Sequence, residues 1–504
     1  MNTVIPVIIS IASMVFWGVL VLSLLVVLHE AGHFILARVC GMRVSEFFVG
    51  MPCKIKASLH LRHWGTEVGI TPLLLGGYTR ICGMSTYQSP YAETVLAYVY
   101  SVGRCSISEC ARAVQCSEDE AYDALMMLAD WCSIRKVSPA QAEKLAACSN
   151  TQHDSAEGAQ YDLQKDLQKD LHLEDHHENQ DNPQDAYAAE RSWYSTVYFE
   201  TMQRDAHNRT MFDTGHNFTG PNTHLQGAPN PQADAHAFYV SEMRSTYNGK
   251  GFVPRMLALA AGPVFNIIGA FVIVVVALSI IGFDAPTNSN TLGAVDPNSY
   301  AAQLGMSAGD TIIAVNDVPT PTWSDVVAAI TTHMREQKPF SLEYTRDDVH
   351  KHVDVDPSQC KQHFGIYAQF ALTHLSPLQS ITVAWRYFSS TMEFIVNLFI
   401  PQHTLETISQ GSSVVGISRF AAQAAERGLE SFLMFCAMIS MSLGCMNLLP
   451  IPPLDGGKAL FEIIQAITRR PVSQKVQAVV LYIGLAFIGV IFLFALYNDI
   501  APML

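Results

Sequence analysis

The sequence has little charge for its length. Of its 504 residues only 15% are charged and 49% are hydrophobic, whereas about a quarter of an average soluble domain is charged. Basic residues are the scarcer kind, 31 against 45 acidic ones, and the net charge is −14. This balance argues against nucleic acid as the main partner. The shortage of charge also argues against a purely cytosolic globular enzyme.

Long uncharged runs are what the sequence has instead. Four of them approach or exceed the about 20 apolar residues that cross a bilayer, at residues 1–28, 256–283, 431–454 and 476–498. The first run has no positive residues before it and no small-residue cleavage site after it, so it does not resemble a removable signal peptide. We expect a polytopic α-helical membrane protein with four transmembrane helices, in segments 1–40, 251–283, 431–457 and 458–504.

Basic residues flank these runs on one side. They follow the first run, precede the second, and lie between the third and the fourth. The positive-inside rule therefore predicts that residues ~40–255 and ~456–475 are cytoplasmic, and that residues 284–430 and both termini are extracytoplasmic. Disulfides are rare in the cytoplasm, so the eight cysteines of the first loop should stay reduced. The outer segment has only Cys360 and thus no disulfide framework of its own.

Two cytoplasmic regions follow the first run. Residues 41–84 alternate apolar and polar positions between Gly and Pro, which predicts a β region associated with the membrane. Residues 85–250 form an insertion. Within it, residues 104–148 predict two amphipathic helices with a capping box at Ser117 and Glu120, similar to a helix-turn-helix or winged-helix unit. No basic face accompanies these helices, so a spacer or docking hairpin is the favoured interpretation. The acidic, His-rich residues 149–250 predict a disordered linker.

The outer segment predicts a small folded domain. The residues Gly-Met-Ser-Ala-Gly-Asp at 305–310 precede an expected strand at 311–315, a helix at 324–334 and a strand at 340–344. This order resembles a PDZ domain, placed at residues 284–370, which would bind a peptide or chain end as an added strand. Residues 371–430 predict an interfacial amphipathic segment rather than a fifth span.

The clearest chemical signal is His29-Glu30-Ala31-Gly32-His33 at the end of the first run. Residues four apart share one face of a helix, so both imidazoles can reach one ion. Zinc suits two imidazoles, a third ligand and an open position. It would activate water and polarise a peptide carbonyl, while Glu30 takes the proton and passes it to the leaving amine. Ionisable groups at the edge of a membrane span cost free energy, so their presence there indicates a functional site.

The third ligand is predicted at the end of the third run, where three prolines precede Asp455. A carboxylate there has no structural reason to be buried unless something binds it. The predicted topology puts His29, His33 and Asp455 at the cytoplasmic ends of their spans, so the three could meet. A surface turn is the alternative for Asp455, but its equal depth with the two histidines favours a metal ligand.

These motifs together resemble those of the site-2 proteases, in particular the bacterial RseP-type (regulator of sigma E protease) intramembrane zinc metalloproteases with one PDZ domain. The matching segments are residues 29–33, 76–78, 261–266 and 447–457. The resemblance implies that Zn²⁺ is bound by His29, His33 and Asp455 and that Glu30 is catalytic. It also implies a membrane-associated β-hairpin near the active site, and substrate contacts at Gly76, Gly77, Tyr78 and Asn447. Asn266 is interpreted as structural.

The resemblance further implies regulated intramembrane proteolysis in the bacterial cytoplasmic (inner) membrane. The substrates would be single-span proteins, such as anti-sigma factors or remnant signal peptides, already cut by an upstream site-1 protease. A zinc transporter or metal sensor is one alternative, although a PDZ-like domain has no evident use there and ligands at one depth do not trace a pathway. An inactive membrane scaffold is the other, although its zinc and catalytic residues are all intact. The insertion at 85–250 has no explanation in the resemblance.

Overall fold

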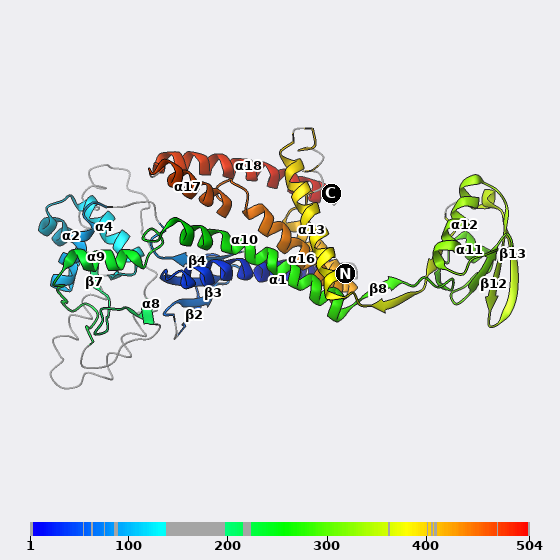
Figure 1. The fold of residues 1–504 in the computed structure, drawn as a ribbon, viewed down its shortest axis with the longest axis horizontal. Coiled ribbons are helices and arrows are strands. Elements are labelled where there is room, and N and C mark those ends of the chain that lie inside the picture. Colours follow the sequence, from blue (N-terminus) through cyan, green and yellow to red (C-terminus); the bar gives the residue numbers. More distant parts are fainter. Residues whose placement is uncertain are drawn as a thin grey trace. The chain divides into compact units, whose positions relative to one another are not determined.

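The computed structural model is drawn in Figure 1. It describes residues 4–501 except for residues 54, 62–63, 75, 85–88, 138–196, 215–222, 361–362, 401, 405–406, 408–410 and 471. The chain forms two units. Unit 1 comprises Met1–Ala270, Tyr387–Glu426 and Phe435–Leu504, and unit 2 comprises Phe271–Arg386 and Arg427–Met434.

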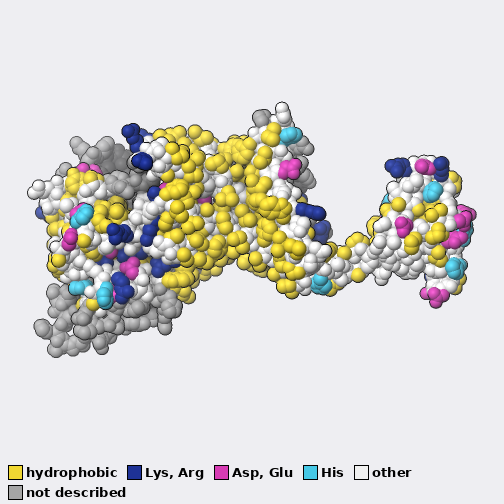
Figure 2. All heavy atoms as spheres, in the orientation of Figure 1, with side chains coloured by type: hydrophobic (Ala, Val, Ile, Leu, Met, Phe, Trp, Pro, Cys, Tyr) yellow, Lys and Arg dark blue, Asp and Glu magenta, His cyan; other side chains and the backbone are white. Residues whose placement is uncertain are grey.

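Four helices in the described part of the chain are long and apolar enough to cross a membrane. They belong to α1 (Val4–Val39), α10 (Phe252–Val275) with the π-helical turn η1 (Val276–Ile281), α16 (Leu429–Asn447) and α18 (Gln474–Ile500). On the face drawn in Figure 2, hydrophobic side chains cover most of the helical part of unit 1, as expected for helices that face lipid. The four predicted spans are confirmed by length and composition, and the chain is a multi-pass membrane protein.

The third span is shorter than predicted. Its helix ends at Asn447, not at residue 457, and a separate helix, α17 (Asp455–Thr468), begins at Asp455. The apolar run continues across this break, which is why hydropathy alone missed it. Proline lacks the N–H that helix hydrogen bonds require, so the segment with Pro450, Pro452 and Pro453 cannot continue α16. Asp455 thereby becomes the first residue of a helix rather than part of a surface turn.

The predicted β region after α1 is present and forms one four-stranded sheet, which is larger than the β-hairpin that the resemblance implies. Its strands are β1 (Val44–Val49), β2 (Ala57–His60), β3 (Glu67–Ile70) and β4 (Gly77–Ile81). They lie in the order β2-β3-β1-β4, and β1 runs parallel to β3 and antiparallel to β4. β4 is therefore an edge strand among the described residues, and it packs against α1.

The insertion is a folded domain. Its elements are α2 (Ala92–Val102), β5 (Arg104–Ser106), α3 (Ile107–Val114), α4 (Glu118–Asp130), β6 (Ile134–Val137) and β7 (Tyr198–Thr201). The predicted helix pair is present as α3 and α4, and Ser117 and Glu120 form the predicted capping box. The sheet has the order β5-β7-β6, and with α2 ahead of the pair this is the element order of a winged helix.

The expectation of a disordered linker over 149–250 is wrong for its second half. Residues 149–196 and 215–222 lie outside the described residues. The rest includes β7, α8 (Met211–Thr214) and α9 (Ala235–Arg244). Phe199 and Phe238 from these elements are buried in the same core as α2 and α4. Composition missed this because few apolar side chains, placed far apart in the sequence, complete the core.

A buried ion cluster joins the insertion to the sheet of unit 1. Glu242 of α9 pairs with Arg204 and with Arg43, the residue before β1, at 2.8 Å each, and Arg43 also pairs with Asp213 at 2.8 Å. Burial raises the pKa of Glu242, but the two guanidinium groups outweigh burial and hold that pKa well below its ordinary value. Glu242 is thus ionised, and its charge is compensated on both sides.

Unit 2 contains the small domain expected at residues 284–370. A sheet of order β11-β10-β12-β13 is formed by β10 (Thr311–Val315), β11 (Val318–Pro319), β12 (Phe340–Arg346) and β13 (Val349–Val355), with α12 (Trp323–Glu336) between β11 and β12. The strands and helix predicted at 311–315, 324–334 and 340–344 are confirmed. The assignment of the domain as PDZ-like stays a prediction. The segment predicted as interfacial includes the helices α13 (Pro377–Leu398) and α15 (Val414–Arg427).

We predict that Glu242→Gln lowers the free energy of unfolding of the insertion by about 3–5 kcal/mol at pH 7, because it leaves two buried arginines with one anion fewer. A group whose folded pKa is depressed stabilises the fold above its unfolded pKa, and that contribution is lost as the pH falls. The difference from wild type should therefore shrink below about pH 4. Pulse proteolysis of the detergent-solubilised chain measures it.

The matched control is Glu93→Gln. Its carboxylate pairs with His236 at the surface, with side-chain exposures of 40% and 73%, so it should change stability by less than about 1 kcal/mol. Equal effects of the two substitutions would show that the buried cluster does not hold the insertion together.

Candidate metal centre

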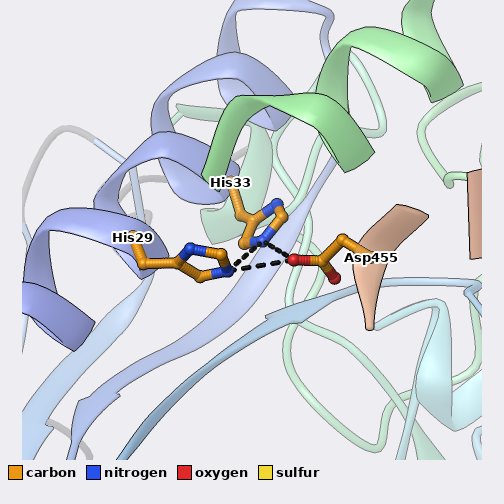
Figure 3. A group of neighbouring side chains, drawn as sticks. All are labelled: His29, His33 and Asp455. Carbon is orange, nitrogen blue, oxygen red and sulfur yellow. Dashed lines mark hydrogen bonds and ion pairs between the residues drawn. The ribbon is translucent and has the colours of Figure 1, made fainter. Parts of the chain in front are cut away.

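Two imidazoles project from one face of α1. His29 and His33 are both buried, and their Nε2 atoms lie 3.2 Å apart. Residues four apart on a helix stand one above the other, so this spacing places both rings on the same side of α1. Figure 3 shows the two Nε2 atoms converging on one point.

Asp455 reaches the same point from the first turn of α17. Its Oδ2 lies 2.9 Å from Nε2 of His29 and 3.1 Å from Nε2 of His33. Among the described residues, this is the one group of three or more His, Cys, Asp or Glu that could hold a metal ion, with ligand atoms within 4.8 Å of one another. The three ligands predicted from the sequence are thus brought together.

Asp455 is held in place by the packing of α17. Further along α17, Glu462 pairs with Arg255 of α10 at 3.0 Å and accepts a hydrogen bond from the Tyr247 hydroxyl at 3.1 Å. These contacts fix α17 against α10.

Helix α10 supplies the surroundings of both histidines. The Nδ1–H of His33 donates to the backbone carbonyl of Ala258 at 2.7 Å, and the amide of Asn266 lies beside Nδ1 of His29 at 3.2 Å. Sequence reasoning did not find these partners. A backbone carbonyl has no residue-specific pattern in the sequence, and the sequence marks Asn266 only as one residue of the matching segment 261–266.

A glycine keeps the space in front of the ligands open. A Cβ at Gly262 would lie 2.4 Å from Nε2 of His33 and 2.7 Å from Nε2 of His29, so any larger residue would fill the place where an ion must sit. Two imidazole nitrogens and a carboxylate oxygen are a donor set that zinc takes in catalytic sites, with one position left for water or substrate. The residues present therefore fit zinc.

Glu30 stands beside this group without belonging to it. It is half-buried, and its side chain lies against β4, because a Cβ at Gly77 would be 3.4 Å from Cγ of Glu30. The Thr79 hydroxyl of β4 donates to the backbone carbonyl of Glu30 at 3.1 Å. Glu30 is thus next to His29 in the sequence and next to the edge strand β4 in space.

The predicted substrate contacts divide into two groups. Gly77 and Tyr78 begin β4, and Gly76 directly precedes it. Gly77 lies against Glu30, and the Tyr78 ring stacks on Phe48 of β1. Asn447 is different. Its amide donates to the carbonyl of Leu443 within α16 at 2.9 Å, and none of its described contacts reaches His29, His33 or Asp455.

The whole chain was also compared with known proteins. The model of peptidase family M50 matches residues 17–491. The regulator of sigma-W protease RasP of Bacillus subtilis is 32% identical over 275 residues, which are 53% of this chain and 64% of that protein. The zinc metalloprotease RasP of Bacillus licheniformis is 27% identical over 495 residues, covering 96% of this chain and 97% of that protein.

We predict that Gly262→Ala abolishes stoichiometric metal binding, because the added methyl group occupies the space between the two Nε2 atoms. The measurement is the zinc content of the purified protein after dialysis against trace zinc. Gly489→Ala in α18 is the matched control, since a Cβ there meets nothing within 4 Å. Full zinc content in the Gly262 variant would contradict the assigned position of the ion.

Proposed function

The chain belongs to peptidase family M50 and is a zinc metalloprotease, and we propose that it cleaves single-span membrane proteins inside or near the bilayer. One observation carries this proposal. Two histidines and an aspartate are buried together between apolar helices, where uncompensated ionisable groups are costly and mark a functional site. A peptidase whose metal ligands lie at such a place acts on substrates that reach it from the membrane.

In this proposal His29, His33 and Asp455 hold the zinc and Glu30 is the catalytic residue. When bound there, zinc would supply the Lewis acidity that activates water and polarises the scissile carbonyl. Glu30 takes a proton from the attacking water and passes it to the leaving amine. Gly262 leaves room for the ion, and the contacts of Ala258 and Glu462 keep a ligand ring and α17 in position.

A transmembrane substrate helix must also be unwound before cleavage, because its backbone N–H and C=O groups are hydrogen-bonded to one another within the helix. The open edge of β4 provides a template. An extended segment pairing with Gly76, Gly77 and Tyr78 would exchange helical hydrogen bonds for strand hydrogen bonds and would pass beside Glu30. Asn447 is the further candidate for holding the scissile strand, once its bond to Leu443 is released.

The substrates are proposed to be anti-sigma factors or remnant signal peptides that a site-1 protease has already trimmed. The relative from Bacillus subtilis is named a regulator of sigma-W protease, which supports the first class. We place the enzyme in the bacterial cytoplasmic (inner) membrane, with residues ~40–255 cytoplasmic and both termini and the PDZ-like domain (284–370) outside, on the positive-inside rule. That domain would exclude substrates whose outer part is still intact.

We predict that Glu30→Gln lowers cleavage of a tagged, pre-trimmed, single-span anti-sigma-type substrate by about 10²–10⁴-fold, because the amide cannot accept the proton. Zinc content should equal that of wild type, whereas Asp455→Ala should lose zinc as well as activity. The measurement is cleavage by purified protein in detergent, with metal analysis of each variant. Unchanged cleavage by Glu30→Gln would overturn its catalytic role.

The same experiment separates the alternatives. Cleavage by wild type alone excludes a transporter or an inactive scaffold. Zinc in both proteins with cleavage by neither would favour a zinc transporter or metal sensor, which metal flux in vesicles would then test.

The proposed exclusion of untrimmed substrates by the PDZ-like domain, called the size filter below, has a separate test. Deleting residues 290–357, which lie wholly within unit 2, should raise cleavage of untrimmed substrate and leave cleavage of trimmed substrate unchanged. Unaltered selectivity after the deletion would contradict the filter.

A further inference from the structure

A buried amide beside one proposed metal ligand leaves its oxygen without a hydrogen-bond partner. Asn266 of α10 is fully buried. Its Nδ2 lies 3.2 Å from Nδ1 of His29, and its Oδ1 is buried with no hydrogen-bond partner. Buried polar atoms without partners are rare in folded proteins, so this orphaned oxygen needs an explanation.

The explanation follows from what a histidine must do to bind an ion. His29 turns Nε2 toward His33 and Asp455, so Nε2 must offer its lone pair there, and the ring proton must sit on Nδ1. An Nδ1–H is a donor, and the Asn266 Nδ2 facing it is also a donor. A half-turn of the amide about its Cβ–Cγ bond keeps its shape and brings Oδ1 to Nδ1.

We propose that Asn266 is the positioning residue of His29: its amide oxygen accepts the Nδ1–H of His29 and holds the ring in the tautomer whose Nε2 binds zinc. This inference rests on the proposed role of His29 as a ligand. The turned amide gives Oδ1 of Asn266 a hydrogen-bond donor. It also places an acceptor, and not a second donor, opposite the Nδ1–H of His29. Metal-binding histidines commonly donate their other ring N–H to such an acceptor.

The second ligand has the same arrangement. The Nδ1 of His33 faces the carbonyl of Ala258 at 2.7 Å, an atom that can only accept. Ala258 and Asn266 stand two turns apart on α10, with Gly262 between them, so one helix presents two acceptors and an open space to the two rings. Asn266 is itself fixed from behind, because the Ser440 hydroxyl of α16 donates to its backbone carbonyl at 2.8 Å.

The test compares zinc affinity in two variants of the full-length, detergent-solubilised protein, by competition with a chromophoric chelator. Asn266→Leu has nearly the same volume and no acceptor, and should weaken zinc binding by about 10–100-fold. Asn266→Asp keeps an acceptor and has no donor. It should bind zinc at least as tightly as wild type, because a carboxylate makes the ligand more basic and its charge is compensated by the ion.

The zinc affinity of Asn266→Asp distinguishes a positioning role of Asn266 from a purely structural one. If the amide acted through its Nδ2, or only filled space, Asn266→Asp would be no better than Asn266→Leu, and the proposal would be overturned. Undiminished zinc affinity in Asn266→Leu would overturn it as well. Ser440→Ala is the control, since it loosens the backbone behind Asn266 without touching the ring, and its zinc affinity should equal that of wild type.

His29→Ala separates the failure of this inference from that of the proposed site. If His29→Ala keeps its zinc, the ligand assignment is wrong. If His29→Ala loses zinc while Asn266→Leu keeps it, the ligand assignment stands and only the role of Asn266 is wrong. Thermal melting of each variant with the metal removed confirms that the fold is retained.

Discussion

Polar side chains buried among apolar helices can persist only when they face one another, and this constraint organises unit 1. His29, His33 and Asp455 come from the two ends of the sequence and meet within hydrogen-bond distance. Neither α1 nor α17 could bury its polar group alone, because an unpaired buried charge costs several kcal/mol. Placing α17 beside α1 is therefore the arrangement that these residues require, and their donor atoms could together hold a metal ion.

Helix α10 is the element on which this arrangement depends. It meets α1 so closely that a Cβ at Gly32 would lie 2.5 Å from the carbonyl oxygen of Ala261. That close approach lets backbone and amide groups of α10 reach both imidazoles. The ion pair between Arg255 and Glu462 then fixes α17 to the same helix. One apolar helix thus sets the positions of all three ligands, although it supplies none of them.

The sequence predicts those features of the fold and the site that short-range patterns encode. The spacing of His29 and His33, the carboxylate at Asp455 and the helix pair α3–α4 follow from periodicity, capping and hydropathy. What it could not predict depends on distant partners. In the sequence Glu242, Arg204 and Arg43 are ordinary polar residues, and only folding buries them together. Composition therefore predicts a disordered linker over residues 149–250. The contact of Ala258 is made by a backbone atom and has no sequence signal.

Zinc K-edge X-ray absorption of the purified, zinc-loaded Glu30→Gln protein tests the central claim most directly, because it reports the ligand atoms without requiring a substrate. The account predicts two imidazole nitrogens, at least one oxygen at about 2.0–2.2 Å and no sulfur. It also predicts that His29→Ala and His33→Ala each fail to retain the ion. Sulfur in the zinc shell, from any of the chain's 11 cysteines, would place the metal elsewhere and contradict the account.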